Sequence, residues 1–459
     1  MVEFLARMNH QAVQLLFALL VIVTLVLLIA RFKLHPFLAL TLASIAIGFH
    51  SGMRLPQIAR TFQEGVGNTL GFLAVVVGLG IMLGKMLAES GGAHVIAQRF
   101  TQLLSGNRLP WAMLLVSLVV GIPVFFAVGL VLLVPVVYAV ARETRTPLLL
   151  LAIPAVSGLS VSQGFLPPHP GPMLAIEQLG ADVGKTIMIG ALIGLPTALV
   201  AGPVFARFIV ARGLVTQESS QGGLGDATVH RGANSNISPP SFGLTLLTIL
   251  LPVFLMLLAS LADLTLSPEN LCRSWADFLG GPAIALLLAV LLSLYSFGYA
   301  RGFTGRQVLK FLEESLAPAA GILLIVGAGG GLSKMLERGG LGATVADIVE
   351  HAKVSPLLLG WLVAASIRVA VGSATVAITM ASAMLAPVAA HTPGVHRELL
   401  VLAMGAGSLF CSHVNDSGFW LVKESFNLTV AQTFKTWTVL ETSIGLVGLG
   451  LVLLLAQFL

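Results

Sequence analysis

The chain contains few charged residues for its length. Asp, Glu, Lys and Arg make up only 10% of its 459 residues, whereas a soluble domain contains about 25%. Hydrophobic residues make up 56% of the sequence, and its mean hydropathy is +0.96. Apolar runs recur along the chain at roughly the 17–25 residues that a bilayer span requires. The composition therefore argues against a soluble protein and predicts a multi-pass membrane protein surrounded by lipid.

Several signatures of catalysis and of cofactor binding are also missing. Cys272 and Cys411 have no spacing typical of a disulfide or a metal site. HExxH, clustered carboxylates and a Walker A pattern are absent, so we expect no metal, no cofactor and no direct use of ATP. Ser412 and His413 are neighbours, but adjacency alone does not make a nucleophile–base pair. An intramembrane enzyme is therefore disfavoured.

The small excess of positive charge fits membrane orientation better than nucleic-acid binding. The net charge is +5, and most of the basic residues fall in loops, so we expect no nucleic-acid partner. With the N-terminus outside, the first half shows a clear positive-inside bias, whereas the second half is nearly balanced. The first apolar segment, 12–30, ends at Arg31 and Lys33 without a small-residue cleavage site, which predicts a membrane span instead of a signal peptide.

The sequence contains an internal repeat. Lys85-Met86-Leu87 recurs 249 residues later as Lys334-Met335-Leu336. The repeat predicts a first membrane unit at 1–215 and a second at 242–459. The segment 216–241 between them is rich in Gly, Ser, Asn and Pro, as expected for a flexible linker.

One long apolar segment in each repeat is expected to turn back on itself. Gly121-Ile122-Pro123 interrupts the segment 110–140, and Gly372-Ser373-Ala374-Thr375 interrupts 356–390. Glycine and proline at these places favour chain reversal, so we predict two re-entrant hairpins. One long kinked helix is the alternative for each segment.

A second kind of interruption occurs once in each repeat. Residues 164–172 contain four prolines around His169, and residues 412–418 form a polar run. Irregular backbone at membrane depth persists only where it lines a cavity or is buried in protein. We therefore predict an all-α integral membrane protein with about ten spanning helices, two re-entrant hairpins and two broken helices in two inverted-topology repeats. Matching breaks of this kind are typical of secondary-transporter substrate sites.

The second repeat offers the strongest candidates for substrate binding. Arg368 lies in an apolar arm, where an arginine is costly and usually faces a cavity or a partner. It could bind a substrate carboxylate through its planar guanidinium, or form a structural pair with Asp416. Gly372, Ser373 and Thr375 offer hydroxyls and a helix start that attracts anions, although small residues also permit close helix packing.

The polar run of the second repeat adds a candidate proton site. Asn415 and Ser417 could bind substrate hydroxyls. Asp416 could exchange a proton during transport, or it could cap the helix that follows. Asp416 is the first choice for proton coupling because it is the only carboxylate centred in a predicted helix break.

The first repeat offers a parallel set. His169 can change charge near neutral pH, and it is therefore a candidate for both substrate binding and proton coupling. A structural hydrogen-bond donor is the alternative for a lone histidine. Ser162, Gln163 and Gly171 lie close to it in sequence and are further candidates for binding the substrate.

These motifs resemble the gluconate:proton symporter (gluconate permease) family, within the ion transporter superfamily, over essentially the whole chain. The resemblance rests on segments 166–172, 368–377, 413–424 and 435–442. It implies proton-driven uptake of gluconate or a related small hydroxy acid across the bacterial inner membrane. The family also includes carriers of other sugar acids, glycerate and D-serine, so these substrates are alternatives, as is an uncoupled anion channel or exchanger. A homodimer is a weaker expectation from related folds.

One position departs from the family pattern. Relatives usually have Asp or Glu where this chain has Ala127. The resemblance therefore implies that the usual acidic proton carrier is missing. Either Asp416 or His169 carries the proton instead, or the coupling is altered.

Overall fold

The computed structural model describes residues 31–213, 238–316, 319–339, 355–392 and 394–459, with scattered positions between 17 and 29. Throughout these ranges the regular elements are helices, and none of the described residues forms a strand. The predicted all-α class is therefore confirmed. Most of the predicted first span, 12–30, and nearly all of the predicted linker, 216–241, lie outside the described residues.

The first half consists of helices joined by short connections. In chain order they are α2 (Pro36–His50), α3 (Leu55–Glu89), α4 (Gly92–Leu103), η1 (Gly106–Arg108), α5 (Leu109–Gly121), α6 (Phe126–Thr144), α7 (Leu148–Phe165), α8 (Pro170–Leu179), α9 (Val183–Leu199), η2 (Val200–Val204) and α10 (Phe205–Ala211).

The second half is built in the same way. Its helices are α12 (Phe242–Thr265), α13 (Leu271–Gly280), α14 (Pro282–Ser293), η3 (Leu294–Gly298), η4 (Tyr299–Arg301), α15 (Gly305–Leu316), α16 (Ala319–Arg338), α18 (Pro356–Val371), α19 (Ala374–His391), α20 (Arg397–Leu409), α21 (Ser417–Ser425), α22 (Val430–Thr433), η5 (Phe434–Thr438) and α23 (Val439–Leu455).

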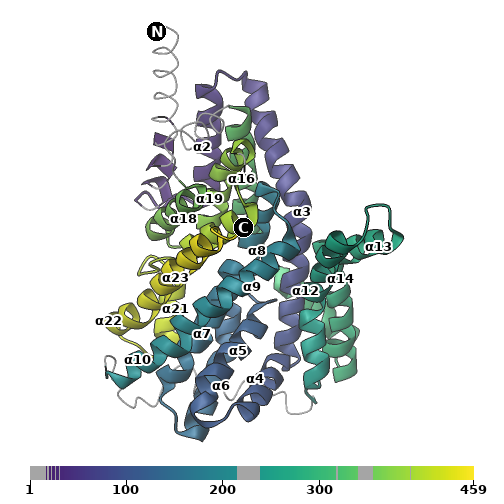
Figure 1. Cartoon of the computed structure of the whole chain (residues 1–459), viewed down its shortest axis with the longest axis vertical. Helices are drawn as coiled ribbons and strands as arrows, with labels where there is room; N and C mark the ends of the chain where they lie inside the picture. The colour runs from purple at the N-terminus through teal and green to yellow at the C-terminus, as the bar shows by residue number, and fades with distance from the viewer. Residues whose placement is uncertain are drawn as a thin grey trace.

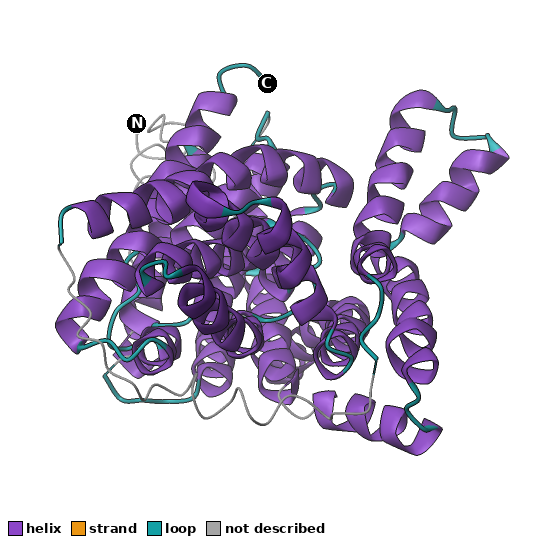
Figure 2. Ribbon diagram, turned by 90° about the horizontal axis from the view of Figure 1, so that it is seen from below, coloured by secondary structure: helices purple, strands orange, loops and turns teal. Residues whose placement is uncertain are grey.

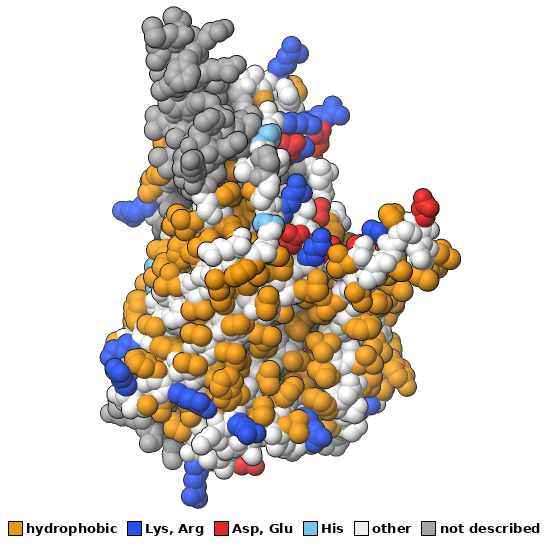
Figure 3. Space-filling view, viewed as in Figure 1, with side chains coloured by type: hydrophobic (Ala, Val, Ile, Leu, Met, Phe, Trp, Pro, Cys, Tyr) orange, Lys and Arg blue, Asp and Glu red, His pale blue; other side chains and the backbone are white. Residues whose placement is uncertain are grey.

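Much of the surface is apolar. Eight helical stretches in the described ranges are long and apolar enough to cross a membrane, and three shorter apolar helices accompany them. Figure 3 shows hydrophobic side chains covering the lower part of the visible face, with Lys and Arg along its lower edge. Such a belt is the surface expected of a protein embedded in lipid. The exact number of crossings, predicted as about ten, stays a prediction.

The order of elements recurs between the halves. The long helix α3 corresponds, 249 residues later, to α15 and α16 together. The pair α5 and α6 corresponds to α18 and α19, and the broken pair α7 and α8 corresponds to α20 and α21. The opposite membrane orientation of the two halves, and their exact bounds, remain predictions.

The chain reverses direction after α5. Gly121 ends α5, Phe126 begins α6, and both helices pack along α7. Four contacts with α7 trace the reversal: Ser117 with Pro154, Gly121 with Ser162, Phe126 with Gln163, and Gly129 with Leu159. Successive residues of α5 contact α7 progressively nearer its C-terminal end, and successive residues of α6 contact it progressively nearer its N-terminal end. This geometry is a hairpin and not one long kinked helix.

The second predicted hairpin has an equally tight tip. Only Gly372 and Ser373 separate α18 from α19, and the two helices pack against each other. Gly372 has a φ of +79°, a left-handed conformation that glycine adopts without steric cost. The tip also approaches the loop before α21, because a Cβ on Gly372 would clash with the Asn415 carbonyl oxygen.

The broken pair α7 and α8 lies in the middle of the bundle (Figure 1), and α20 packs against both of these helices. Nearly every residue of α7 and α20 is buried, and the helices cross so closely that a Cβ on Gly405 would clash with the Gly164 carbonyl oxygen. By contrast, α12, α13 and α14 form an arm beside the main bundle, as both views show (Figures 1 and 2). The arm contacts the bundle mainly through α3 and α9.

The close crossing of α7 and α20 predicts that Gly405→Ala is destabilising. The added methyl must push two helix backbones apart, and overpacking of this kind costs about 1–3 kcal/mol. We expect a lower midpoint of thermal unfolding in detergent. Gly450→Ala in α23 is the matched control, since a Cβ there meets no atom within 4 Å. Equal midpoints for the two variants would contradict the packing described.

Candidate functional site

A cavity of about 820 Å³ lies where the hairpin tips meet the interrupted helices. Binding sites for small molecules usually enclose about 300–1,000 Å³. Apolar walls come from both halves, for example from Phe125 and Val376. The charged and hydrogen-bonding side chains on its wall are Lys85, Glu89, Ser160, Gln163, Glu314, Ser315, Arg368, Ser373, Thr375, Asp416, Ser417, Trp437 and Glu441.

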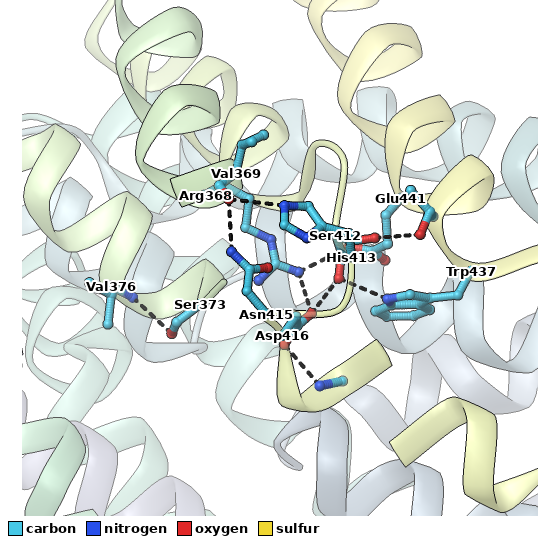
Figure 4. Close-up of polar contacts among 12 residues, drawn as sticks. Arg368, Val369, Ser373, Val376, Ser412, His413, Asn415, Asp416, Trp437 and Glu441 are labelled. Atoms are coloured by element: carbon cyan, nitrogen blue, oxygen red, sulfur yellow. Dashed lines mark hydrogen bonds and ion pairs between the residues drawn. The ribbon is translucent and has the colours of Figure 1, made fainter. Parts of the chain in front are cut away.

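Arg368 lies in the last turn of α18, on the cavity wall. Its side chain is 3% exposed, and its Nη2 donates a hydrogen bond of 2.6 Å to Asp416 Oδ2. Its Nε is buried without an acceptor among the described residues. Figure 4 shows the guanidinium next to Asp416 at the loop before α21. The pair that the sequence suggested between Arg368 and Asp416 is therefore present, and the guanidinium retains an unused donor.

Asp416 is held by several donors at the start of α21. Its Oδ1 accepts a hydrogen bond of 2.8 Å from Gly418 N, which makes it the N-cap of that helix. Its Oδ2 accepts from Arg368 and from the Ser412 hydroxyl. Trp437 Nε1 in turn donates to Ser412 Oγ over 2.8 Å. The capping role and the ion pair thus coexist in one carboxylate.

Glu441 is a site residue that the sequence reasoning did not single out. It lies in the first turn of α23, is 1% exposed, and places Oε2 3.9 Å from Arg368 Nη2. No described donor lies in good hydrogen-bond geometry to either carboxylate oxygen, although the Ser160 hydroxyl on the same cavity wall interacts with this carboxylate. A lone carboxylate in a long apolar helix is the signal that could have found it.

The tip of the second hairpin presents its polar groups to the cavity. Gly372, Ser373 and Thr375 all line it. Ser373 is the N-cap of α19, and its hydroxyl accepts from Val376 N at 3.4 Å. Because a helix N-terminus favours negative charge, the α19 start and Arg368 together make this wall suitable for an anion.

The loop before α21 is fastened to the end of α18. The Asn415 side-chain amide donates to Val369 O over 2.8 Å, and His413 Nε2 contacts the same oxygen at 3.0 Å. Asn415 is not among the residues that line the cavity, whereas Ser417 is. The structure therefore gives Asn415 a positioning contact, and it leaves Ser417 in reach of a bound molecule.

Of the four candidates in the first half, the structure places one on the cavity wall. Gln163 lines the cavity, and its Oε1 accepts from Phe126 N over 3.2 Å. Ser162 donates to Leu118 O, and His169 Nε2 lies 2.5 Å from Gly121 O at the hairpin tip. Gly171 packs against Ile378. Ser162, His169 and Gly171 thus contact the hairpins and hold the interrupted helix against them.

Ala127 also lies on the cavity wall, one residue into α6. The position at which the family resemblance implies an acid is therefore at the site, and in this chain it carries a methyl group. The carboxylates that do line the cavity are Glu89, Glu314, Asp416 and Glu441.

A second charged group on the wall was also missed from the sequence. Lys85 Nζ lies 2.7 Å from Glu89 and 3.5 Å from Glu314, and all three side chains are partly exposed. The sequence identifies Lys85 only as part of the repeat. Because the pair Lys85–Glu314 joins helices of different halves, local sequence pattern gives no sign of it.

The chain is similar to several permeases and transporters over nearly its whole length. It is 49% identical to a gluconate permease of Pseudomonas aeruginosa over 98% of this chain and 99% of the relative. It is 42% identical to the high-affinity gluconate transporter of Escherichia coli (93% and 96%) and 39% identical to the D-serine transporter DsdX of the same organism (91% and 92%). These relatives are transporters and not enzymes.

A solved structure shares the fold. MtrF of Neisseria gonorrhoeae, described within a class of antimetabolite efflux pumps, superposes with a TM-score of 0.67 over 93% of this chain and 96% of MtrF, at 16% identity. The family model for GntP family permeases matches residues 13–459. With its apolar helices, the chain is a multi-pass transporter of the bacterial inner membrane, and it belongs to the GntP family of permeases.

Proposed function

We propose that the protein imports gluconate or a related small hydroxy-monocarboxylate and that protons drive this import. Two relatives that share 42–49% of their residues with this chain are named for gluconate. The cavity is large enough for such a molecule and is lined by hydroxyl and amide groups beside a cation. Hydroxyls suit the polyol part of the substrate, and the cation suits its carboxylate.

The observation that carries this proposal is the position of Arg368. Its guanidinium is buried at the cavity wall with an unpaired Nε, and Ser373 and Thr375 line the same cavity. Arginine binds carboxylates through two parallel N–H donors. A substrate carboxylate would satisfy the free donor, and the start of α19 would add the attraction of its N–H groups.

Proton coupling would follow from the charge of the incoming substrate. An anion entering a buried site is repelled by carboxylates already there, and protonation of one of them removes that repulsion. Proton and substrate binding are then linked through one coupling free energy. Asp416 and His169 are the candidates from the sequence, and the cavity adds further carboxylates.

A different small acid is the second candidate substrate. DsdX is named for D-serine and is 39% identical to this chain, so the shared fold and site are compatible with more than one carboxylate. An uncoupled exchanger or channel would use the same cavity without accumulating its substrate.

Uptake by proteoliposomes tests the proposal. Purified protein is reconstituted, a pH gradient is imposed, and uptake of gluconate, glycerate, other sugar acids and D-serine is measured in parallel. We expect gluconate to accumulate above equilibrium and accumulation to stop when the pH gradient is collapsed. Simple equilibration of gluconate would overturn proton coupling, and preference for D-serine would overturn the substrate.

A further inference from the structure

The two carboxylates beside Arg368 are stabilised very unequally. Asp416 accepts hydrogen bonds from Arg368, Ser412 and Gly418 N. Glu441 is at least as deeply buried, but no described donor lies in good hydrogen-bond geometry to its oxygens, and Ser160 is the hydroxyl that interacts with it. A charged carboxylate without donors is expensive to bury, whereas one that accepts several hydrogen bonds is compensated.

The charges in this cluster do not balance when both acids are ionised. Arg368 contributes one positive charge, and Asp416 and Glu441 contribute two negative charges within 4 Å of its guanidinium. A bound monocarboxylate would leave three negative charges around a single cation. Binding one proton at the cluster restores neutrality before the substrate arrives and leaves Arg368 able to attract it.

We propose that Glu441 is the group that binds the coupling proton, while Asp416 stays ionised as the partner of Arg368 and the cap of α21. This inference rests on the proposed function and completes it. A proton from water in the cavity binds the Glu441 carboxylate, and the substrate carboxylate then binds Arg368. After the site opens to the other side, substrate and proton leave together.

No other charged side chain competes for this role near Glu441 in the described structure. The helices packed on α23 are α7, α9, η2, α18, α20 and η5. Arg368 on α18 is the charged residue that reaches Glu441, and Asp416 binds the same Nη2 of that guanidinium. By sequence α7 and η2 carry no charge, and Lys435 in η5 is exposed. The remaining charged residues lie at the ends of α9 and α20 that are far from Glu441. At those ends Asp182 N donates to Glu398, and Lys185 N donates to the Asp182 side chain.

A purely structural role for Glu441 is the competing explanation. A structural counter-ion would be expected to share hydrogen bonds with Arg368, as Asp416 does at 2.6 Å. Glu441 instead lies at 3.9 Å without such a bond, and it lines the cavity. These features place it where a proton from the cavity can reach it.

The test uses Glu441→Gln and Glu441→Asp in the full-length protein. The amide mimics the protonated acid, so Glu441→Gln should retain gluconate counterflow without a gradient, within about threefold of the wild type. It should lose accumulation driven by a pH gradient, which for one coupled proton amounts to about tenfold per pH unit. Glu441→Asp should restore part of the accumulation. Glu424→Gln is the control, because that carboxylate is exposed, paired with Lys423 and away from the cavity.

Infrared difference spectra of the protein provide a readout that does not depend on transport. During a pH titration, the wild type should show a carbonyl stretch from a protonated carboxyl that Glu441→Gln lacks and Glu424→Gln retains. Unchanged spectra and undiminished accumulation in Glu441→Gln would overturn the proton site while leaving gluconate transport intact. If the spectra show that Glu441 binds a proton but the protein does not transport gluconate, the proton site stands and the proposed function is wrong.

Discussion

Arg368→Ala should weaken gluconate binding by about ten- to a hundredfold. A hydrogen bond to a charged group is worth about 1.5–3 kcal/mol, and each 1.4 kcal/mol is a factor of ten in affinity. The gluconate affinity of Arg368→Lys should lie between those of the wild type and Arg368→Ala, because lysine keeps the charge but loses the planar pair of donors. Equilibrium binding of labelled gluconate to purified protein measures the change.

The matched control for this prediction is Arg397→Ala. Arg397 begins α20 and donates to Gly180 O at 3.3 Å, away from the cavity. It should bind gluconate as the wild type does. Because removal of Arg368 also leaves Asp416 without its cation, each variant must first show a single symmetric peak in gel filtration. Unchanged affinity in a well-folded Arg368→Ala protein would rule out the anion site.

Replacement of Asp416 should destabilise the protein by an amount that depends on the substitute. Asp416→Ala removes both the helix cap and the partner of a buried arginine, and breaking a buried ion pair costs about 3–5 kcal/mol. Asp416→Asn keeps a good N-cap but loses the charge. We expect the midpoint of thermal unfolding to fall furthest for Asp416→Ala and less for Asp416→Asn.

The same pair of variants separates structure from coupling. If Asp416 acts as a cap and an ion-pair partner, folded Asp416→Asn protein should still couple gluconate accumulation to the pH gradient. Asp182→Asn is a matched control, since Asp182 is also an N-cap, at α9, but lies away from the cavity. If Asp416→Asn loses pH-driven accumulation but retains counterflow, Asp416 is the residue that binds the coupling proton.

The interruptions of the hydrophobic segments were predictable from sequence because their causes are local. Gly121 and Pro123 end one helix where the chain must reverse, and Gly372 supplies the positive φ that the second reversal requires. The pairing of Arg368 with Asp416 was also foreseeable, because an arginine in an apolar segment needs an acidic partner. These features follow from backbone preference and from the cost of burying charge.

The rest of the site depends on contacts between distant segments. Glu441 becomes a site residue only because α23 packs beside α18 and α7, and nothing in its immediate sequence specifies that neighbour. His169 illustrates the converse, since its polar loop suggested the cavity while its ring contacts Gly121 O at the hairpin tip. Sequence pattern identifies which residues are unusual in a membrane segment, and packing decides what they face.

The most direct test of the central claim is whether gluconate carries protons with it. Proteoliposomes without any imposed gradient are loaded with a pH-sensitive dye, and gluconate is added outside. Proton-coupled import predicts that the interior acidifies after gluconate is added, and that protein-free liposomes and liposomes given an unrelated anion show no such change. Entry of labelled gluconate at the same rate with no change of interior pH would contradict the account.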